Sequence, residues 1–250
     1  SEAVPTGALA EKDMPSRVVH QGDGVAWLEQ AALGPEHAVV TSLPDVSEVP
    51  LDFDAWRAWF VGVARLACER THPESVAVFF QTDIKHEGRW VDKAYLVQRG
   101  AEEAESALLF HKIVCRAPVG TTTFGRPAYA HLLCFSRERR LEPGRSTPDV
   151  LARLGKMTWA RAMGIEVCEA VARFLVAETA CRVVVDPFAG LGTMLAVANA
   201  HGLDAVGVEL SKKRARRAET LSLERLEERR GRGGDAELAA PLANGEHREP

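Results

Sequence analysis

The segment Arg182 to Ala200 combines residue types that could hold a nucleotide-like ligand: RVVVDPFAGLGTMLAVANA. A run of β-branched residues ends at Asp186, a turn of small residues follows, and an apolar helix is predicted after it. Gly190 and Gly192 let the backbone turn sharply and approach a ligand, while the helix points its first N–H groups at the ligand's negative end. The spacing matches neither the G-x-G-x-x-G dinucleotide fingerprint nor a phosphate-binding loop. The segment therefore indicates a different nucleotide-type cofactor turn.

An acidic residue follows this turn at a characteristic separation. Glu209 lies near the end of the run DAVGVEL, about 20 residues beyond the glycines, where a doubly wound fold places a carboxylate on ribose hydroxyls. Taken separately, the glycines could simply close a βα turn, and Glu209 could be a solvated charge. Together they favour a cofactor site.

Three stretches of the chain resemble one family. DPFAGLGTMLAVANAHGLDAVGVELSKKRARRA resembles the cofactor half of the S-adenosylmethionine (SAM)-dependent amino-methyltransferases, the DNA adenine-N6 and cytosine-N4 methylases. RVVHQGDGVAWLEQAALGPEHAVVTSLPD resembles the first segment of the permuted β-type members, and LLFHKIVCR with FGRPAYAHLLCFSR is similar to their late strands. The resemblance covers nearly all of the predicted folded part. It implies an α/β, Rossmann-like class I methyltransferase fold, with a mostly parallel seven-stranded sheet, helices on both faces and circularly permuted motifs.

The resemblance also implies a SAM site. The methionine and ribose part would be lined by Asp186, Phe188, Ala189, Gly190, Gly192 and Thr193. Glu209 would hold the ribose hydroxyls, and Asp23, in QGDG, would contact the adenine end, unless it forms only an Asp-Gly turn. Lys156 to Gly164, KMTWARAMG, occupies the position of another cofactor-side motif but lacks its usual His-Pro and Lys-Pro letters.

TSLPD, from Thr41 to Asp45, stands where the family's catalytic motif reads Asp, Asn or Ser, then Pro-Pro, then Tyr or Phe. The amine of a base is a poor nucleophile because its lone pair is delocalised into the ring. An enzyme helps by accepting both amine hydrogens and aligning the nitrogen with the SAM methyl group. The resemblance implies that Ser42 supplies a side-chain oxygen, Leu43 a backbone carbonyl and Pro44 a stiff turn.

Asp45 departs from the family pattern, because it replaces the ring on which a target base would stack, a contact worth roughly 1–3 kcal/mol. Phe80, Trp90 and Phe124 are candidates for a substitute ring, although each could instead pack in the core. The Asp45 carboxylate could accept hydrogen bonds from a guanine-type edge or act as a general base. Alternatively, it could cap the following loop in an inactive site.

Several other charged or ligating residues stand in segments that could reach a substrate. The arginines predicted to contact nucleic acid are Arg116, Arg126, Arg137, Arg139, Arg140 and Arg145. KKRARR, at 212–217, is interpreted as a solvated helix face. The histidines of strand-like segments, His20, His111 and His131, show no metal-ligand spacing, and the five cysteines include no C-x-x-C pair. We predict no metal site.

Alternating elements must position these residues. Short apolar runs typical of strands occur in RVVH, HAVVT, SVAVFFQT, AYLVQ, LLFHKIVC, YAHLLCFS, RVVVD and DAVGVEL, with helical periodicities between many of them. This alternation predicts a mostly parallel sheet covered on both faces. Residues 1–16 and 226–250 are predicted to be flexible ends of a single methyltransferase domain spanning 17–225.

The chain has 250 residues, 46% hydrophobic and 26% charged, with a net charge of -4, so global charge gives no nucleic-acid footprint. It contains neither a membrane-spanning run nor a signal-peptide pattern, which favours an intracellular location, cytoplasmic or nuclear. We expect a SAM-dependent N-methyltransferase that acts on a base of DNA or RNA. The sequence is compatible with a homodimer and with a complex with a partner subunit. The alternatives are a catalytically silent SAM-fold subunit and a methyltransferase for a small molecule or protein.

Overall fold

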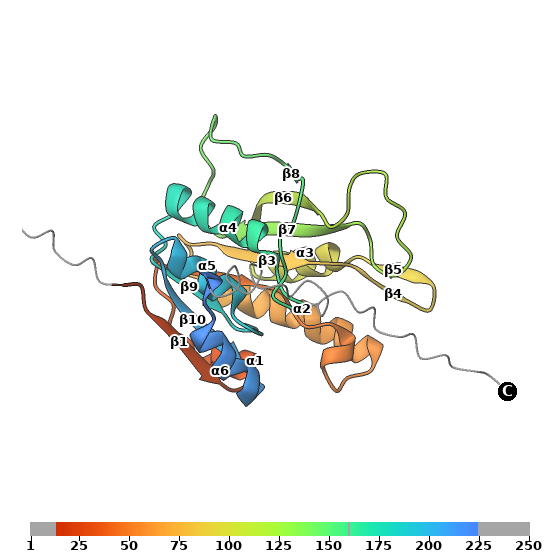
Figure 1. Cartoon of the computed structure of the whole chain (residues 1–250), viewed down its shortest axis with the longest axis horizontal. Helices are drawn as coiled ribbons and strands as arrows, with labels where there is room; N and C mark the ends of the chain where they lie inside the picture. Colours follow the sequence, from red (N-terminus) through yellow and green to blue (C-terminus); the bar gives the residue numbers. More distant parts are fainter. Residues whose placement is uncertain (1–13, 160, 225–250) are drawn as a thin grey trace, which may run out of the picture.

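The computed structural model describes residues 14–159 and 161–224 (Figure 1). Its main sheet has eight strands in the order β1-β10-β9-β2-β3-β7-β6-β8. These strands are β1 (Arg17–Gln21), β2 (His37–Thr41), β3 (Ala77–Gln81), β6 (Ala107–Cys115), β7 (Tyr129–Ser136), β8 (Val150–Leu151), β9 (Val183–Asp186) and β10 (Asp204–Glu209). A separate hairpin consists of β4 (Ile84–His86) and β5 (Arg89–Val91).

The helices connect these strands. They are α1 (Gly24–Gln30), α2 (Phe53–Arg70), α3 (Lys93–Glu103), α4 (Ile165–Glu178), α5 (Thr193–Ala200) and α6 (Lys212–Thr220), with a short 3₁₀ helix, η1 (Val46–Glu48). Strands β1, β10, β9, β2 and β3 pair in parallel, whereas β7 pairs antiparallel with both β3 and β6. The sheet is therefore mostly parallel, as the sequence predicts, and β2 lies directly beside β9.

Burial on both faces explains the unbroken apolar runs of the central strands. All five residues of β3 are buried, and so are the last four of β2. Val40 and Val78 belong to one apolar core with α4 and α5, whereas Val39 and Phe79 belong to a second core with α1, α2 and α3. Figure 1 shows α4 and α2 on opposite sides of the sheet. The continuous hydrophobic pattern thus reflects a sheet covered by helices on both sides.

Two sequence predictions about elements are wrong. The sheet has eight strands rather than seven, because the two-residue β8 adds to the edge beside β6. AYLVQ, expected as a strand-type run, lies inside α3. Asp92 caps this helix by accepting the N–H of Tyr95 at 2.9 Å, and Leu96 and Val97 are buried while Tyr95 faces out. A short apolar run has the same composition in a buried strand and on the inner face of a helix.

The two predicted flexible ends fall almost wholly outside the described residues, which begin at Met14 and end at residue 224. Ser16 lies within the described part, and its backbone N–H donates to the Asp204 carboxylate at 2.6 Å. The domain boundaries at 17 and 225 stay a prediction. Among residues 14–159 and 161–224, no helix has the length and apolar character that crossing a membrane requires.

Candidate active site

The parallel strands have their C-terminal ends on the same side of the sheet, and two adjoining pockets lie there. The larger, here called the strand-end pocket, has a volume of about 160 Å³. It brings together the sequence-predicted residues Asp23, Ser42, Leu43, Pro44, Asp186, Phe188, Ala189, Gly190, Thr193 and Glu209. The pocket lies at the ends of β9 and β2, from which the connections to β10 and to β3 run in opposite directions along the sheet. Doubly wound folds bind ligands at such a point.

Asp186 is a buried carboxyl at the end of β9. Its Oδ1 accepts hydrogen bonds from the Thr41 hydroxyl at 2.7 Å and from the Phe188 N–H at 3.0 Å. Burial, together with the nearby charge of Glu209, raises the pKa of Asp186 to about 7, although these two hydrogen bonds oppose the shift. A cationic ligand in the pocket would therefore favour the ionised carboxylate.

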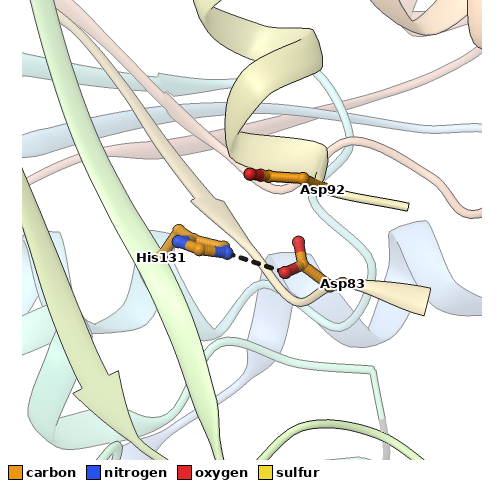
Figure 2. A group of neighbouring side chains, drawn as sticks. All are labelled: Asp83, Asp92 and His131. Carbon is orange, nitrogen blue, oxygen red and sulfur yellow. Dashed lines mark hydrogen bonds and ion pairs between the residues drawn. The ribbon is translucent and has the colours of Figure 1, made fainter. Parts of the chain in front are cut away.

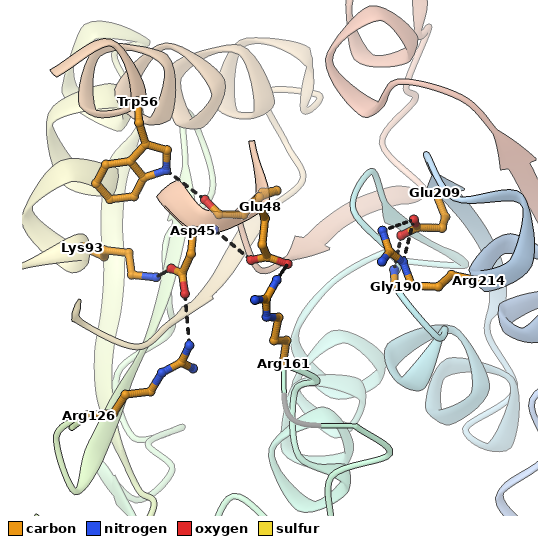
Figure 3. A network of polar contacts seen from close by, with 10 residues as sticks. Asp45, Glu48, Trp56, Lys93, Arg126, Arg161, Gly190, Glu209 and Arg214 are labelled. Carbon is orange, nitrogen blue, oxygen red and sulfur yellow. Dashed lines mark hydrogen bonds and ion pairs between the residues drawn. The ribbon is translucent and has the colours of Figure 1, made fainter. Parts of the chain in front are cut away.

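Glu209 ties the glycine turn to the end of β10. Its Oε2 accepts the Gly190 N–H at 3.1 Å (Figure 3). Its Oε1 accepts the Ser211 N–H at 2.8 Å. Arg214 donates from Nε to the same Oε1 at 2.9 Å, and its guanidinium lies 5.7 Å from the centre of the Trp159 ring. Arg214 belongs to KKRARR, so one member of this cluster lines the strand-end pocket instead of facing only solvent.

The QGDG turn lies beside Glu209, because Gln21 pairs with Glu209 in register and the Gly22 N–H donates to the Glu209 backbone carbonyl at 3.1 Å. Asp23 lines the pocket and also caps α1, because its Oδ1 accepts the Ala26 N–H at 2.8 Å. The adjacent Gly24 packs directly against the glycine turn: a Cβ there would lie 2.1 Å from the Pro187 carbonyl oxygen. Only glycine allows this approach. The two turns, far apart in the sequence, therefore make one continuous wall.

Gly192 is placed differently from the other predicted cofactor residues. It does not line the strand-end pocket, and its φ of 79° starts α5 in the left-handed region. A Cβ on Gly192 would lie 2.8 Å from the Cα of Ala218, so the glycine permits α5 to pack on α6. The next residue, Thr193, meets the Thr158 hydroxyl at 2.7 Å. This contact brings the segment 156–164 to the pocket, which Trp159 and Met163 help to line.

The second pocket, here called the Asp45 pocket, has a volume of about 40 Å³ and adjoins the first. Of the sequence-predicted residues, it contains Ser42, Leu43, Asp45, Phe80, Arg116 and Arg126. The residues that line both pockets are Ser42, Leu43, Glu48, Arg161 and Ala162. The catalytic-type motif therefore forms the boundary between the two spaces.

A network of charged groups surrounds Asp45 (Figure 3). One carboxylate oxygen accepts from the ammonium of Lys93, and the other accepts from Arg126 at 3.2 Å. Lys93 is 3% exposed, and burial lowers its pKa although Asp45 opposes that shift. Both oxygens of Asp45 are thus held by cations, on the side of the motif away from the strand-end pocket.

A second ion pair lies between the two pockets. Glu48 accepts the backbone N–H of Asp45 at 2.9 Å through Oε2, and its Oε1 pairs with Arg161 at 3.0 Å. Figure 3 shows the Arg161 side chain reaching Glu48 between the Asp45 group and the Glu209 group. The Glu48–Arg161 pair therefore links the two pocket walls.

The remaining predicted substrate residues are not in either pocket. Trp90 lies on β5 and is 53% exposed, and Phe124 is 87% exposed in the loop between β6 and β7. Arg137 and Arg139 donate to backbone carbonyls at the N-terminal side of β3, including those of Thr71 and Glu74. These two arginines brace the opposite edge of the sheet, contrary to their predicted place beside the substrate.

A compact cluster of ligand-type side chains lies below the start of α3: Asp83, Asp92 and His131 (Figure 2). His131 Nε2 meets Asp83 at 3.0 Å, and its Nδ1 meets His111 Nε2 at 2.9 Å. The other oxygen of Asp83 accepts the Lys93 N–H at 2.9 Å. Both nitrogens of His131 thus have protein partners, and the cluster anchors the helix start that carries Lys93.

Sequence reasoning missed several residues that line these pockets: Glu48, Trp59, Lys93, Trp159, Arg161 and Arg214. Glu48 and Arg214 lie close to the two motifs in the sequence, whereas Lys93, Trp159 and Arg161 lie far from both. Trp159 and Arg161 could have been identified from the sequence, because KMTWARAMG stands at the position of a cofactor-side motif of the family that the chain resembles. Lys93 could not have been identified in this way, since its helix was not predicted.

Known proteins resemble this chain in structure but not detectably in sequence. No protein-family model matches the chain, and no curated protein sequence does. Solved structures do match. A protein of Thermus thermophilus assigned as a DNA modification methylase has a TM-score of 0.63 at 22% identity, covering 81% of this chain and 92% of that one. The cytosine-N4-specific PvuII DNA methyltransferase has a TM-score of 0.66 at 13% identity, covering 88% and 93%.

This chain has a methyltransferase fold. A further match, to the M1.HpyAVI–SAM complex, has a TM-score of 0.57 at 14% identity and covers 81% of this chain and 97% of that one. The T. thermophilus protein was also solved with SAM bound. All of these identities are low, so the likeness concerns the architecture, and the chemistry must be argued from the two pockets.

Proposed function

We propose that this chain is a SAM-dependent methyltransferase that transfers a methyl group to a nitrogen of a nucleic-acid base, in DNA or RNA. The observation that carries the proposal is the shared wall of Ser42 and Leu43 between the strand-end pocket and the Asp45 pocket. A cofactor in the first pocket and an acceptor in the second would meet at this motif. Two of the matching solved structures contain SAM.

The residues of the strand-end pocket fit SAM. The buried carboxyl of Asp186 has one oxygen engaged and a pKa near neutrality, so it suits the ammonium group of the methionine part. Glu209 Oε2 accepts the Gly190 N–H and has a second lone pair for a ribose hydroxyl. Phe188, Trp59 and Trp159 supply apolar surface for the adenine ring beside Asp23. Bound SAM would supply an electrophilic methyl group.

The motif residues suit an amine acceptor. Among the described residues, the Ser42 hydroxyl makes no hydrogen bond, so its oxygen can accept one amine hydrogen while the Leu43 carbonyl accepts the other. Trp56 fixes the turn, because its indole N–H donates to the Pro44 carbonyl at 3.1 Å. Such fixed acceptors keep an amine lone pair directed at the methyl group.

Two measurements test the proposal. Isothermal titration calorimetry with SAM examines the cofactor site, and radiolabelled methyl transfer to DNA, total tRNA and rRNA examines the acceptor. We expect SAM to bind and label to enter one nucleic acid. SAM binding without transfer to any nucleic acid would overturn the acceptor half of the proposal. Transfer to a small molecule or a protein instead would redirect it.

One observation favours a second candidate, a catalytically silent SAM-fold subunit that supports an active partner. Asp45 stands where the family has an aromatic ring, and both of its oxygens are held by Lys93 and Arg126. The Asp45 pocket, at about 40 Å³, also leaves little room beside Ser42. This candidate predicts SAM binding but no methyl transfer by the isolated chain.

A further inference from the structure

Aromatic side chains are distributed unevenly over the surface. In the part of the chain that the structure describes, the aromatic rings counted as exposed are those of Trp90, Tyr95, Phe124 and Tyr129, which are 53%, 55%, 87% and 41% exposed. We call these four residues the aromatic rim. All four lie on three segments: the β4–β5 hairpin with the start of α3, the loop between β6 and β7, and the first residue of β7.

Three of the four rings in the aromatic rim are linked to residues of the Asp45 pocket, through the chain or through contacts. Tyr95 follows the pocket residue Lys93 by two positions, and Phe124 precedes the pocket residue Arg126 by two. The Tyr129 ring meets His131 edge-on at 5.5 Å, and His131 bonds to Asp83, which holds the backbone of Lys93. Each of these rings is therefore tied to the pocket wall by a short stretch of chain or by a chain of contacts.

Cations lie among the rings. The Lys85 ammonium stands 4.7 Å from the centre of the Trp90 ring, and Arg89 occupies the neighbouring exposed position on the hairpin. Arg116 and Arg126 flank the loop that carries Phe124 and line the Asp45 pocket. Exposed rings interleaved with cations suit the binding of single-stranded nucleic acid. Its unpaired bases can stack on the rings, and its phosphates can contact the cations.

We propose that the aromatic rim is a binding surface for a single-stranded segment of nucleic acid that flanks the target base. This inference rests on the proposed function and names its substrate class more narrowly. The rings can stack only on bases whose faces are free, which excludes the stacked interior of a duplex. The rim also supplies, outside the pocket, the stacking surface that Asp45 does not supply inside it.

The test uses the full chain and three fluorescein-labelled probes: a single-stranded 15-mer of mixed sequence as DNA, the same 15-mer as RNA, and the annealed DNA duplex. Binding is followed by fluorescence anisotropy with S-adenosylhomocysteine present. The variants are Tyr95→Ala, Trp90→Ala and Tyr129→Ala, together with Trp90→Phe, which keeps a ring. Val176→Ala is the matched control, because Val176 is 49% exposed on α4 and lies away from the rim.

We expect each ring-to-alanine change to weaken single-strand binding roughly 5- to 150-fold, the range that removal of one base-stacking ring produces. Trp90→Phe and Val176→Ala should stay within about threefold of the unmodified chain. Tyr95→Ala is the decisive variant, because alanine favours the first turn of α3 and Tyr95 is largely exposed, so folding is preserved. SAM affinity, measured by calorimetry on the same samples, should not change.

Single-strand binding that is insensitive to all three ring variants would overturn the inference, and so would binding of the duplex in preference to both single strands. No binding of either strand by a chain that binds SAM would also overturn it. Rim-dependent strand binding without methyl transfer would leave the inference standing and contradict the catalytic half of the proposed function. The two failures are therefore distinguishable.

Discussion

The two pockets at the sheet edge are built in different ways. The strand-end pocket depends on strand ends and two turns, with Asp186 and Glu209 held by backbone N–H groups of those turns and by the side chains of Thr41 and Arg214. The Asp45 pocket instead depends on charged side chains from distant segments, Lys93 from α3 and Arg126 from the β6–β7 loop. The first pocket is built at the strand ends and turns of the sheet, whereas the second depends on ion pairs between distant segments. The cofactor side should therefore tolerate changes to the acceptor side, and several substitutions can test that separation.

The largest expected effect is on stability, from Asp45→Ala. The change leaves the buried Lys93 ammonium without its carboxylate, which should cost about 3–5 kcal/mol of unfolding free energy. Urea denaturation measures the loss. The matched double variant, Asp45→Leu with Lys93→Met, removes both charges and should recover much of it. A single variant within about 1 kcal/mol of the unmodified chain would show that the pair is not a structural element.

Ser42→Ala should have the next largest effect, on methyl transfer alone. Loss of one fixed acceptor for the amine should lower kcat by roughly 100- to 1000-fold, by analogy with the loss of one preorganised hydrogen-bonding group. SAM affinity should stay constant, because Asp186 and Glu209 are untouched. Single-turnover transfer and SAM titration are measured on the same preparation. Equal losses in both would mean that the pockets are not separable.

The substitution Asp186→Asn should change how stability and SAM affinity depend on pH, because Asp186 is a titrating group of the strand-end pocket. In the unliganded protein the pKa of Asp186 is raised to about 7 from 3.8, so the folded chain keeps a proton that the unfolded chain has lost. This group's contribution to stability is therefore full below pH 3.8 and is lost as pH rises to about 7. SAM affinity should run the other way, rising as the carboxylate forms, by up to about tenfold per pH unit.

The asparagine variant should show neither dependence, because it does not titrate, and its oxygen can still accept from Thr41 and Phe188. Calorimetry in two buffers of different ionisation enthalpy supplies a second readout: SAM binding near neutral pH should release a proton from the unmodified chain. The variant should release none from this site. The same proton release in both proteins would assign the titration to another group.

Trp56→Phe should have the smallest effect. It removes the indole donor to the Pro44 carbonyl while keeping a buried ring, and it should cost about 0.5–1.5 kcal/mol of stability. If the turn positions the Leu43 carbonyl, kcat should fall while SAM affinity holds. Unchanged kcat with reduced stability would limit the role of Trp56 to packing.

The same contrast explains what the sequence could reveal. The strand-end pocket was predictable because Asp186, the glycine turn and Glu209 lie within one βαβ unit, where local pattern determines their positions. Lys93 could not be found, because AYLVQ has the composition of a strand and only tertiary packing makes it helical. The eighth strand, β8, has two residues and carries no periodicity.

The predicted placement of Arg137 and Arg139 beside the substrate is wrong for a similar reason. Their loop leaves the end of β7, which runs antiparallel to β3, and so it emerges at the edge opposite the pockets. Composition identifies a basic loop but not the edge of the sheet on which it lies. The direction of the preceding strand determines the end of the sheet at which a loop emerges. Because β7 is antiparallel to β3, its following loop lies at the end opposite the pockets.

The Glu48–Arg161 pair has a thermodynamic consequence. It belongs to both pocket walls, so a ligand that moves either side chain alters the other ligand's surroundings. Any such coupling must be reciprocal: if an acceptor strengthens SAM binding by some factor, SAM strengthens acceptor binding by the same factor. The two pockets are built from different groups, but the Glu48–Arg161 pair lines both of them. Through this pair, binding of one substrate can change the affinity for the other, which allows ordered or cooperative binding.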